Sequence, residues 1–154
     1  MNITWSCKAF DQLTTSELYS ILQLRNEVFI VEQNCPYQDC DNKDPGSDHF
    51  MGWYQDRLVA YTRLLPAGLA FEELSIGRVV TSPSVRGMKA GRELMLRSIE
   101  KIYELHGRNP IKIGAQLYLK VFYESLGFTQ CSDVYLEDDI EHIKMIRNSC
   151  STVQ

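Results

Sequence analysis

A strand-like run that ends in a glycine-containing turn constrains the fold more than any other part of this chain. Leu74–Thr81 is rich in β-branched residues, and the turn after it opens a segment with helical apolar spacing, Ala90–Leu105. Unpaired backbone N–H groups and the helix dipole favour an anion at the start of such a helix. Gly87 and Gly91 let the backbone approach a pyrophosphate closely. The sequence therefore predicts a strand–turn–helix unit with an anion-binding turn.

Basic side chains surround the same turn, at Arg86, Lys89 and Arg92. Their positive charge suits a phosphate group, which the start of a helix also favours. A glycine-containing loop with solvated basic residues would have the same composition, however, so the turn alone leaves both interpretations open.

Further strands and helices are predicted on both sides of this unit. A capping box at Thr14 and Glu17 begins a helix that carries apolar residues as far as Phe29, and Leu117–Leu126 is a second helical stretch. Residues 34–48 form a polar loop with several breakers. Strands are expected at Ile3–Phe10, Phe50–Tyr54, Leu58–Leu65, Ile111–Ala115, Thr129–Tyr135 and His142–Ile146, the second and third joined as a hairpin.

This order of elements predicts the fold class. Strands and helices mix along the chain, and no linker or repeat divides residues 1–154. We therefore expect a single α/β domain of the α+β kind, with a central mixed, mostly antiparallel sheet flanked by helices.

Composition excludes several classes of protein. With 44% hydrophobic and 23% charged residues, the chain has the balance of an ordinary globular domain. Its net charge of −4 argues against a nucleic-acid partner, and no apolar run is long enough to span a membrane. The N-terminus has no signal-peptide pattern, so we expect a cytoplasmic protein.

The five cysteines are odd in number and follow no repeating interval, which is typical of free thiols in a reducing compartment. Cys35 and Cys40 flank Asp39 in the polar loop, which could suggest a metal site. Because the loop lacks two close-spaced ligand pairs, we expect no metal.

The residues of the turn match a known family signature. Arg86-Gly87-Met88-Lys89-Ala90-Gly91 resembles the Arg/Gln-x-x-Gly-x-Gly/Ala motif of the GNAT (Gcn5-related) N-acetyltransferases. The resemblance implies that these six residues and Arg92 hold the pyrophosphate of coenzyme A, with acetyl-CoA as co-substrate. Lys89 stands where the family usually has glycine, and we expect a negative φ there, with the ammonium group beside a phosphate.

A second stretch, residues 116–128, resembles the C-terminal motif of the same family, in which a helix ends in Phe-Tyr-x-x-x-Gly-Phe. By this resemblance, Gln116 contacts the pantetheine arm. Tyr123 lies near the coenzyme A sulfur and acts as the general acid. Phe122 and Phe128 are expected in the hydrophobic core.

Two further segments, residues 22–39 and 137–145, look like the ElaA branch of this family. The resemblance now covers nearly the whole chain and implies the GNAT fold. It also implies transfer of an acetyl group to an unidentified primary amine, on a small molecule or a protein. A homodimer paired through sheet edges is a further expectation by resemblance. The alternative is a catalytically silent acyl-CoA-binding or protein-interaction module on the same fold.

The resemblance also assigns a role to the fourth predicted strand. In GNAT proteins a bulge opens this strand, so that its backbone N–H groups face the acetyl carbonyl. Here the corresponding residues are Val79, Val80 and Thr81.

The general base that must deprotonate the attacking ammonium group has several candidates. Glu32 and Glu72 are the expected catalytic carboxylates. Glu32 shares a helix face with apolar Val28 and Phe29, where a charged group either pairs or lines a cavity. The resemblance implies that a base can stand at Glu72, at the start of the fourth strand. Glu73, His49 and His142 are alternatives.

Structural roles compete with catalytic ones at several charged residues. Arg25 lies seven residues before Glu32, on the same helix face. The sequence therefore leaves two alternatives for these residues, an ion pair between them or a catalytic role for Glu32. The loop with carboxylates at Asp39, Asp41 and Asp44, here called the acidic loop, would suit a cationic acceptor. A loop that is merely solvated would have the same composition.

Overall fold

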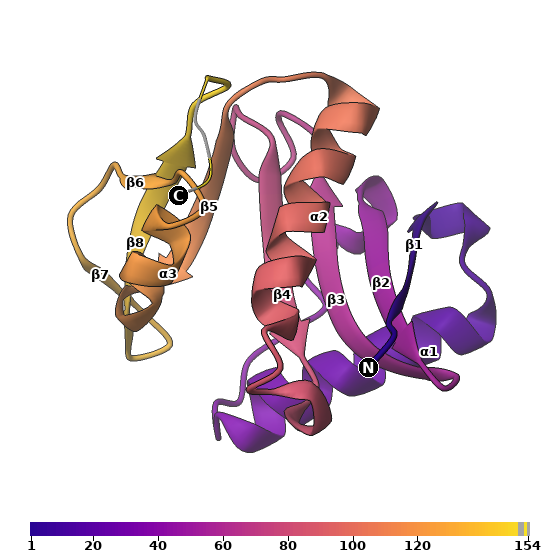
Figure 1. Ribbon diagram of the computed structural model, residues 1–154. Coiled ribbons are helices and arrows are strands. Elements are labelled where there is room, and N and C mark those ends of the chain that lie inside the picture. The colour runs from indigo at the N-terminus through magenta and orange to yellow at the C-terminus, as the bar shows by residue number, and fades with distance from the viewer. Residues whose placement is uncertain (151–152, 154) are drawn as a thin grey trace.

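The computed structural model describes residues 1–150 and 153, and its strands form two antiparallel sheets (Figure 1). The first sheet has the order β1 (Thr4–Ala9), β2 (Asp48–Tyr54), β3 (Arg57–Leu65), β4 (Ser75–Thr81). The second sheet has the order β5 (Ile111–Gln116), β8 (Ile140–Arg147), β6 (Thr129–Gln130), and β7 (Tyr135–Glu137) also pairs with β8. The α+β fold class predicted from the sequence is confirmed.

Two helices cover opposite faces of the first sheet. Apolar side chains of α1 (Thr15–Arg25) pack on one face, and those of α2 (Ala90–His106) pack on the other. A π-helix, η2 (Asn26–Glu32), continues α1, and α3 (Lys120–Glu124) lies against the second sheet. Short 3₁₀ turns occur at η1 (Phe10–Gln12), η3 (Asp44–Gly46), η4 (Pro83–Val85) and η5 (Leu117–Leu119). Among the described residues, no helix combines the length and apolarity needed to cross a membrane.

The local signals in the sequence act as expected. The Thr14 hydroxyl accepts from the Glu17 amide at 3.1 Å, and the Glu17 carboxylate accepts from the Thr14 amide at 2.8 Å. This capping box satisfies two of the free N–H groups at the start of α1. Between β2 and β3, Gln55 and Asp56 have φ values of +47° and +62°, the left-handed pair that a tight two-residue hairpin requires.

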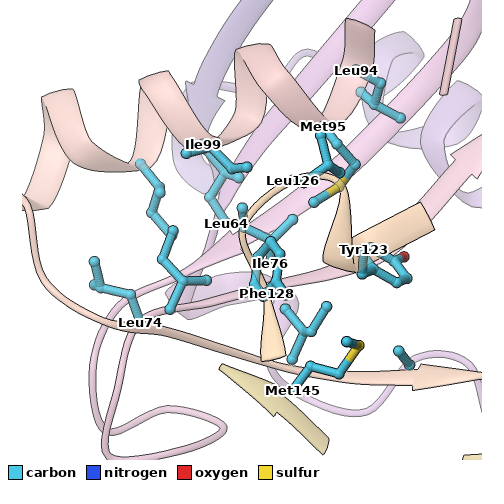
Figure 2. Packing of buried hydrophobic residues seen from close by; sticks show 14 of the residues in the cluster. Leu64, Leu74, Ile76, Leu94, Met95, Ile99, Tyr123, Leu126, Phe128 and Met145 are labelled. Atoms are coloured by element: carbon cyan, nitrogen blue, oxygen red, sulfur yellow. The ribbon is translucent and has the colours of Figure 1, made fainter. Parts of the chain in front are cut away.

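The larger hydrophobic core lies between α2 and both sheets (Figure 2). One face of α2 is buried through Leu94, Met95, Ile99 and Ile102, which are the positions that helical spacing predicted. Phe128 is buried in the same cluster, and Phe122 packs against it, so the predicted structural roles of both phenylalanines are confirmed. This packing ties the second sheet to the first.

A single parallel contact joins the two sheets within the described residues. Leu74 forms an isolated parallel bridge with Ile111, and the Lys112 amide donates to the Leu74 carbonyl at 2.8 Å. Beyond this bridge β4 and β5 form no ladder. The mixed character predicted for the sheet is therefore confined to one end of these two strands, and the other end is left open.

A β-bulge changes the direction of β4 in its middle. Tyr61 of β3 is opposite Val80 and Arg63 is opposite Gly77, so two residues of β4 face a single residue of β3. The extra residue reverses the alternation of side chains. Ile76 therefore packs with α2, whereas Val80 packs with α1.

Two predicted elements differ from the structure. Thr129–Tyr135 is not one strand, because the chain leaves the ladder after Gln130 and the Lys144 amide donates to the Ser132 hydroxyl at 2.8 Å. A side chain replaces the backbone acceptor there, which interrupts the pairing. Leu117–Leu126 is only partly α-helical, since it begins as the 3₁₀ turn η5.

Candidate active site

A cavity of about 710 Å³ opens where β4 and β5 no longer pair. The middle and end of β4 form one wall, and the end of β5 with the residues after it forms the opposite wall. The π-helix η2 and the turn between β7 and β8 contribute the remaining sides. Residues that are far apart in the sequence thus meet around one space.

Most of the catalytic and acyl-binding residues predicted from the sequence line this cavity. They are Glu32, Val79, Val80, Thr81, Arg86, Gln116 and Tyr123. The remaining residues of the predicted pyrophosphate turn follow Arg86 directly, outside the cavity itself, at Gly87, Met88, Lys89, Ala90, Gly91 and Arg92. Glu72 does not line the cavity; it is exposed in the segment before β4, at the end of the strand remote from the turn.

The turn before α2 has the features of an anion site. Gly87 has a φ of +81°, and α2 begins at Ala90 without a side-chain cap, so no side chain satisfies its first N–H groups. A Cβ added at Gly91 would meet no atom within 4 Å, which leaves space beside the first turn of the helix. These properties fit a phosphate group, which would accept from the free N–H groups.

Lys89 contradicts one expectation from the sequence. We expected a negative φ, but Lys89 precedes α2 with a φ of +59°, in the left-handed region. For a residue with a Cβ this conformation costs about 1–2 kcal/mol. Lysine therefore adopts the backbone of the family's glycine rather than avoiding it.

Replacing Lys89 with glycine is expected to leave the free energy of unfolding unchanged or to raise it by up to about 1 kcal/mol. The relief of left-handed strain is partly offset by the greater entropy of the unfolded chain. Lys89→Ala removes the same charge but keeps the strain, so it is the matched control. Urea unfolding of both variants without ligand measures the difference, and a glycine variant less stable than the alanine variant would contradict the expectation.

Arg86 and Arg92 connect the turn to its neighbours. The Arg86 guanidinium pairs with the Glu32 carboxylate on η2, and both side chains are about 40% exposed. Arg92 Nη1 donates to the Ser125 hydroxyl at 2.9 Å, just after α3. The two family-like motifs, separated by some thirty residues of sequence, therefore touch in space.

Tyr123 is buried and lines the cavity, and Figure 2 shows its ring among the buried hydrophobic side chains. Its side chain is 6% exposed and packs edge-on against Phe122 and Phe128. Burial raises the pKa of Tyr123 to about 12, so the hydroxyl keeps its proton at neutral pH. Within the described part of the chain, no protein group hydrogen-bonds to this hydroxyl. The phenol is therefore a protonated donor available to a ligand.

The candidate bases separate clearly by position. Glu32 and His142 line the cavity, whereas Glu72, Glu73 and His49 do not. His49 is fully buried, with Nδ1 2.7 Å from the Tyr61 hydroxyl and Nε2 2.9 Å from the Asp44 carbonyl. Its Nε2–H donates to that carbonyl, and burial lowers its pKa, so the neutral ring accepts from the tyrosine. His49 has a structural role.

The predicted ion pair between Arg25 and Glu32 does not form. Arg25 is fully buried and pairs with Asp39 and Asp44, at 2.8 and 2.9 Å, while Glu32 faces Arg86. The reason is the change from α- to π-helix at Asn26. A π-helix has more residues per turn, so a spacing of seven no longer returns to the same face.

The acidic loop is not a solvated loop, because Asp39 and Asp44 are buried, although its Asp41 is partly exposed and lines the cavity. Its aspartates pair with three arginines from α1, β3 and β4. Asp44 accepts from Arg25 and from Arg63, and Asp41 accepts from Arg63 at 2.7 and 2.9 Å. Three arginines and three aspartates thus form one network of ion pairs that fixes the loop.

Acid is expected to destabilise the protein through this cluster. Burial alone would raise the pKa of Asp41 and Asp44, but hydrogen bonds from the arginines outweigh it and hold both pKa values below the usual range. Their contribution is complete above about pH 5, one unit above the pKa of an unfolded aspartate, and is lost as the pH falls further. Urea midpoints should therefore fall between about pH 5 and 3. Asp41→Asn should flatten this dependence, and an unchanged slope in that variant would exclude Asp41 as a source.

Arg78 is the site residue that sequence reasoning missed. It occupies the bulge of β4 with a φ of +47°, and its side chain lines the cavity. The available signal was Gly77, since an isolated glycine inside a strand pattern suggests a bulge.

No group of three or more metal-ligating side chains occurs in residues 1–150 and 153. Cys35 lines the cavity and Cys40 is exposed, and neither forms a disulfide. The loop that carries them is organised by the arginine–aspartate pairs described above.

Comparison with known proteins identifies the family of this chain. The family described as acetyltransferase (GNAT) domain matches residues 15–148. The protein ElaA of Escherichia coli (strain K12) is 45% identical over 147 residues, covering 94% of this chain and 96% of ElaA. The crystal structure of Escherichia coli ElaA superposes with a TM-score of 0.90 at 43% identity, covering 96% of this chain and all of that chain (100%).

A second solved structure is similar to the same degree. It is an acyl-CoA N-acyltransferase from Pseudomonas aeruginosa, with a TM-score of 0.91 at 43% identity over 95% of this chain and 99% of that one. Both solved structures are therefore similar to this chain in sequence as well as in fold, over nearly its full length. This chain belongs to the GNAT family of acetyltransferases and, within it, to the ElaA-like branch.

Proposed function

We propose that this protein is an acetyl-CoA-dependent N-acetyltransferase that acetylates a primary amine by direct attack while both substrates are bound. The observation that carries the proposal is a single cavity that contains a protonated phenol, a carboxylate and the bulged edge of β4. The uncapped start of α2 lies beside it. The acceptor is an amine of a small molecule or of a protein.

The residues of the turn suit coenzyme A. In our proposal the free N–H groups at the start of α2 hold the pyrophosphate, and the basic side chains of Arg86 and Lys89 add positive charge. Gln116 lines the cavity at the end of β5 and would contact the pantetheine arm. Acetyl-CoA, when bound, supplies the acetyl group as a thioester. The protein contributes by holding the reactants close, which can lower the barrier by about 7–11 kcal/mol.

Tyr123 is the proposed general acid. Its pKa of about 12 keeps the phenol protonated, and a departing thiolate needs a proton at the moment the carbon–sulfur bond breaks. No described protein group forms a hydrogen bond with the Tyr123 hydroxyl. The hydroxyl can therefore donate to the coenzyme A sulfur without first losing another hydrogen bond.

Glu32 is the proposed general base. It lines the cavity from the π-helix η2, and its exposure allows it to reach an entering amine. π-Helical segments occur frequently at functional sites. Glu72 has no place in this proposal, because it lies outside the cavity. His142 also lines the cavity, but its Nδ1 donates to the Ile140 carbonyl at 2.7 Å and its Nε2 is 3.3 Å from Glu137.

The backbone of Val79, Val80 and Thr81 is the proposed binding site for the acetyl carbonyl. These residues follow the bulge and line the cavity. Backbone N–H groups aimed at a carbonyl stabilise the negative charge that develops on its oxygen during attack.

The reaction is proposed to take place in the cytoplasm. Five free cysteines, one of them in the cavity, suit a reducing compartment. No disulfide would be needed to hold the loop that carries Cys35 and Cys40, since arginine–aspartate pairs hold it already.

Excess acetyl-CoA is expected to raise the thermal unfolding midpoint by several degrees. A ligand at 100 times its Kd adds about 2.7 kcal/mol to the stability of a folded domain. Differential scanning fluorimetry with acetyl-CoA, and with adenosine as a control, measures the shift. Release of free thiol with a panel of amines then tests transfer.

The two measurements separate the alternatives. A thermal shift followed by amine-dependent thiol release supports the proposal. A shift without transfer to any amine would favour a silent acyl-CoA-binding module. No shift at millimolar acetyl-CoA would contradict the assignment of the turn.

A further inference from the structure

The bulge of β4 depends on a residue with an unfavourable backbone conformation. Arg78 has a φ of +47°, in the region that favours glycine, and it is one of the two residues opposite the single residue between Tyr61 and Arg63. A positive φ is unfavourable for any residue with a Cβ, so contacts with other parts of the molecule must stabilise this backbone conformation. The question is which contacts hold the bulge open.

The Arg78 guanidinium supplies these contacts. Its Nε donates to Asp39 Oδ1 at 2.8 Å, and its Nη2 donates to the Asp39 backbone carbonyl at 3.0 Å. The same nitrogen lies 3.4 Å from Asp41 Oδ2, and the guanidinium lies over the Tyr37 ring at 5.9 Å. The planar fork is thus fixed by two hydrogen bonds to one residue, an arrangement that a lysine cannot reproduce.

Asp39 is itself fixed from the opposite side. Its Oδ2 accepts from Arg25 Nε at 2.8 Å, and its carbonyl accepts from Arg25 Nη2 at 3.2 Å. Arg25 is fully buried and also pairs with Asp44, which Arg63 contacts on β3. A continuous series of buried and partly buried ion pairs therefore connects the bulge to α1, to the acidic loop and to the neighbouring strand.

We infer that Arg78 is a positioning residue: its ion pair with Asp39 holds the β4 bulge so that the backbone after it faces the acetyl carbonyl. The inference rests on the proposed function, in which Val79, Val80 and Thr81 bind that carbonyl. Arg78 acts through the backbone rather than by touching the reacting atoms. The acidic loop is also a positioning element, because its carboxylates fix the Arg78 guanidinium instead of binding the acceptor.

The position of Arg78 predicts that its loss affects the binding of the acetyl carbonyl but not the affinity for acetyl-CoA as a whole. The bulge lies at the acyl end of the cavity, whereas the pyrophosphate turn begins only after Ser82 and is held by its own contacts. Loss of the guanidinium should therefore alter how the acetyl carbonyl is held while leaving the affinity for the rest of acetyl-CoA nearly unchanged. A general loss of stability would instead reduce both.

The test uses the infrared stretching band of acetyl-CoA labelled with ¹³C at the thioester carbonyl, bound to the full chain. Hydrogen bonds to a carbonyl lower its stretching frequency, so the bound band should lie below that of free acetyl-CoA. In Arg78→Gly the band should return toward the free value, because glycine tolerates the positive φ but lacks the side chain that fixes the bulge. The Kd for acetyl-CoA should change by less than about twofold.

Gln55→Gly is the matched control. Gln55 has the same φ of +47°, but it lies in the turn between β2 and β3 and does not line the cavity. This variant should keep the wild-type carbonyl band. Arg78→Lys should resemble Arg78→Gly, because an ammonium group cannot make the two hydrogen bonds to Asp39. With an amine that accepts the acetyl group, kcat of Arg78→Gly should fall roughly tenfold to a hundredfold, with the KM for acetyl-CoA little changed.

The outcomes distinguish this inference from the proposed function. A lowered band in the wild type and a restored band in Arg78→Gly supports the inference. A lowered band in both would overturn it and leave the proposed function intact. A wild-type band equal to that of free acetyl-CoA, or no binding at all, would overturn the proposed acyl site and the inference with it.

Discussion

Tyr123→Phe is expected to lower turnover by about a hundredfold to ten-thousandfold, the usual contribution of a positioned general acid. The thiolate of coenzyme A would leave without a proton, while the ring would keep its packing against Phe122 and Phe128. Since the hydroxyl makes no hydrogen bond to the described protein groups, the free energy of unfolding should stay within about 0.5 kcal/mol of the wild type. Steady-state thiol release and urea unfolding measure the two quantities.

Tyr118→Phe is the control for this experiment. Tyr118 also lines the cavity, but its side chain is largely exposed. Removing its hydroxyl should have little effect on turnover. Isothermal titration should give the same acetyl-CoA affinity for Tyr123→Phe as for the wild type. An unaltered kcat in that variant would remove Tyr123 from the mechanism.

Gly91→Glu is expected to weaken acetyl-CoA binding by about tenfold to a thousandfold. The new carboxylate would stand in the first turn of α2, beside the proposed pyrophosphate, where repulsion between like charges amounts to about 1–4 kcal/mol. A Cβ at this position meets no atom within 4 Å, so the folded protein accommodates the side chain. Isothermal titration with acetyl-CoA measures the loss.

Gly91→Ala separates the two causes that the glutamate combines. It adds a Cβ without a charge at a helical position, so stability should stay the same or rise by up to about 1 kcal/mol. If alanine weakens binding as much as glutamate, close approach of the backbone is the main requirement. If neither variant changes the affinity, the pyrophosphate does not bind at this turn.

The sequence predicted those features that depend on neighbouring residues. The capping box at Thr14, the hairpin turn at Gln55 and Asp56, and the buried face of α2 all follow from local hydrogen bonding or from periodicity. The family signature also placed Tyr123 and the bulged strand correctly relative to one cavity. A motif carries this information because the same backbone geometry recurs wherever its residues recur.

Other features could not be predicted because they depend on distant partners. Helical periodicity paired Arg25 with Glu32, but after the change to π-helix Glu32 pairs with Arg86. Arg25 pairs instead with Asp39 and Asp44 of the acidic loop. The left-handed conformation of Lys89 likewise contradicts its own preference. At Lys89 the folded chain thus adopts a conformation that costs about 1–2 kcal/mol for an isolated residue with a Cβ.

By itself, the sequence predicted the order of most elements, the glycine-containing turn before α2 and the choice of Tyr123 as the candidate phenol. Only the tertiary structure decided which carboxylate reaches the cavity, and it separated Glu32 from Glu72 by placing them at different ends of β4. It also decided that Asp39 and Asp44 are buried partners of arginines rather than surface charges. The physical reason is that the free energy of burying a charge depends on all the elements packed around it. These elements are far apart in the sequence, so no local pattern of residues can predict it.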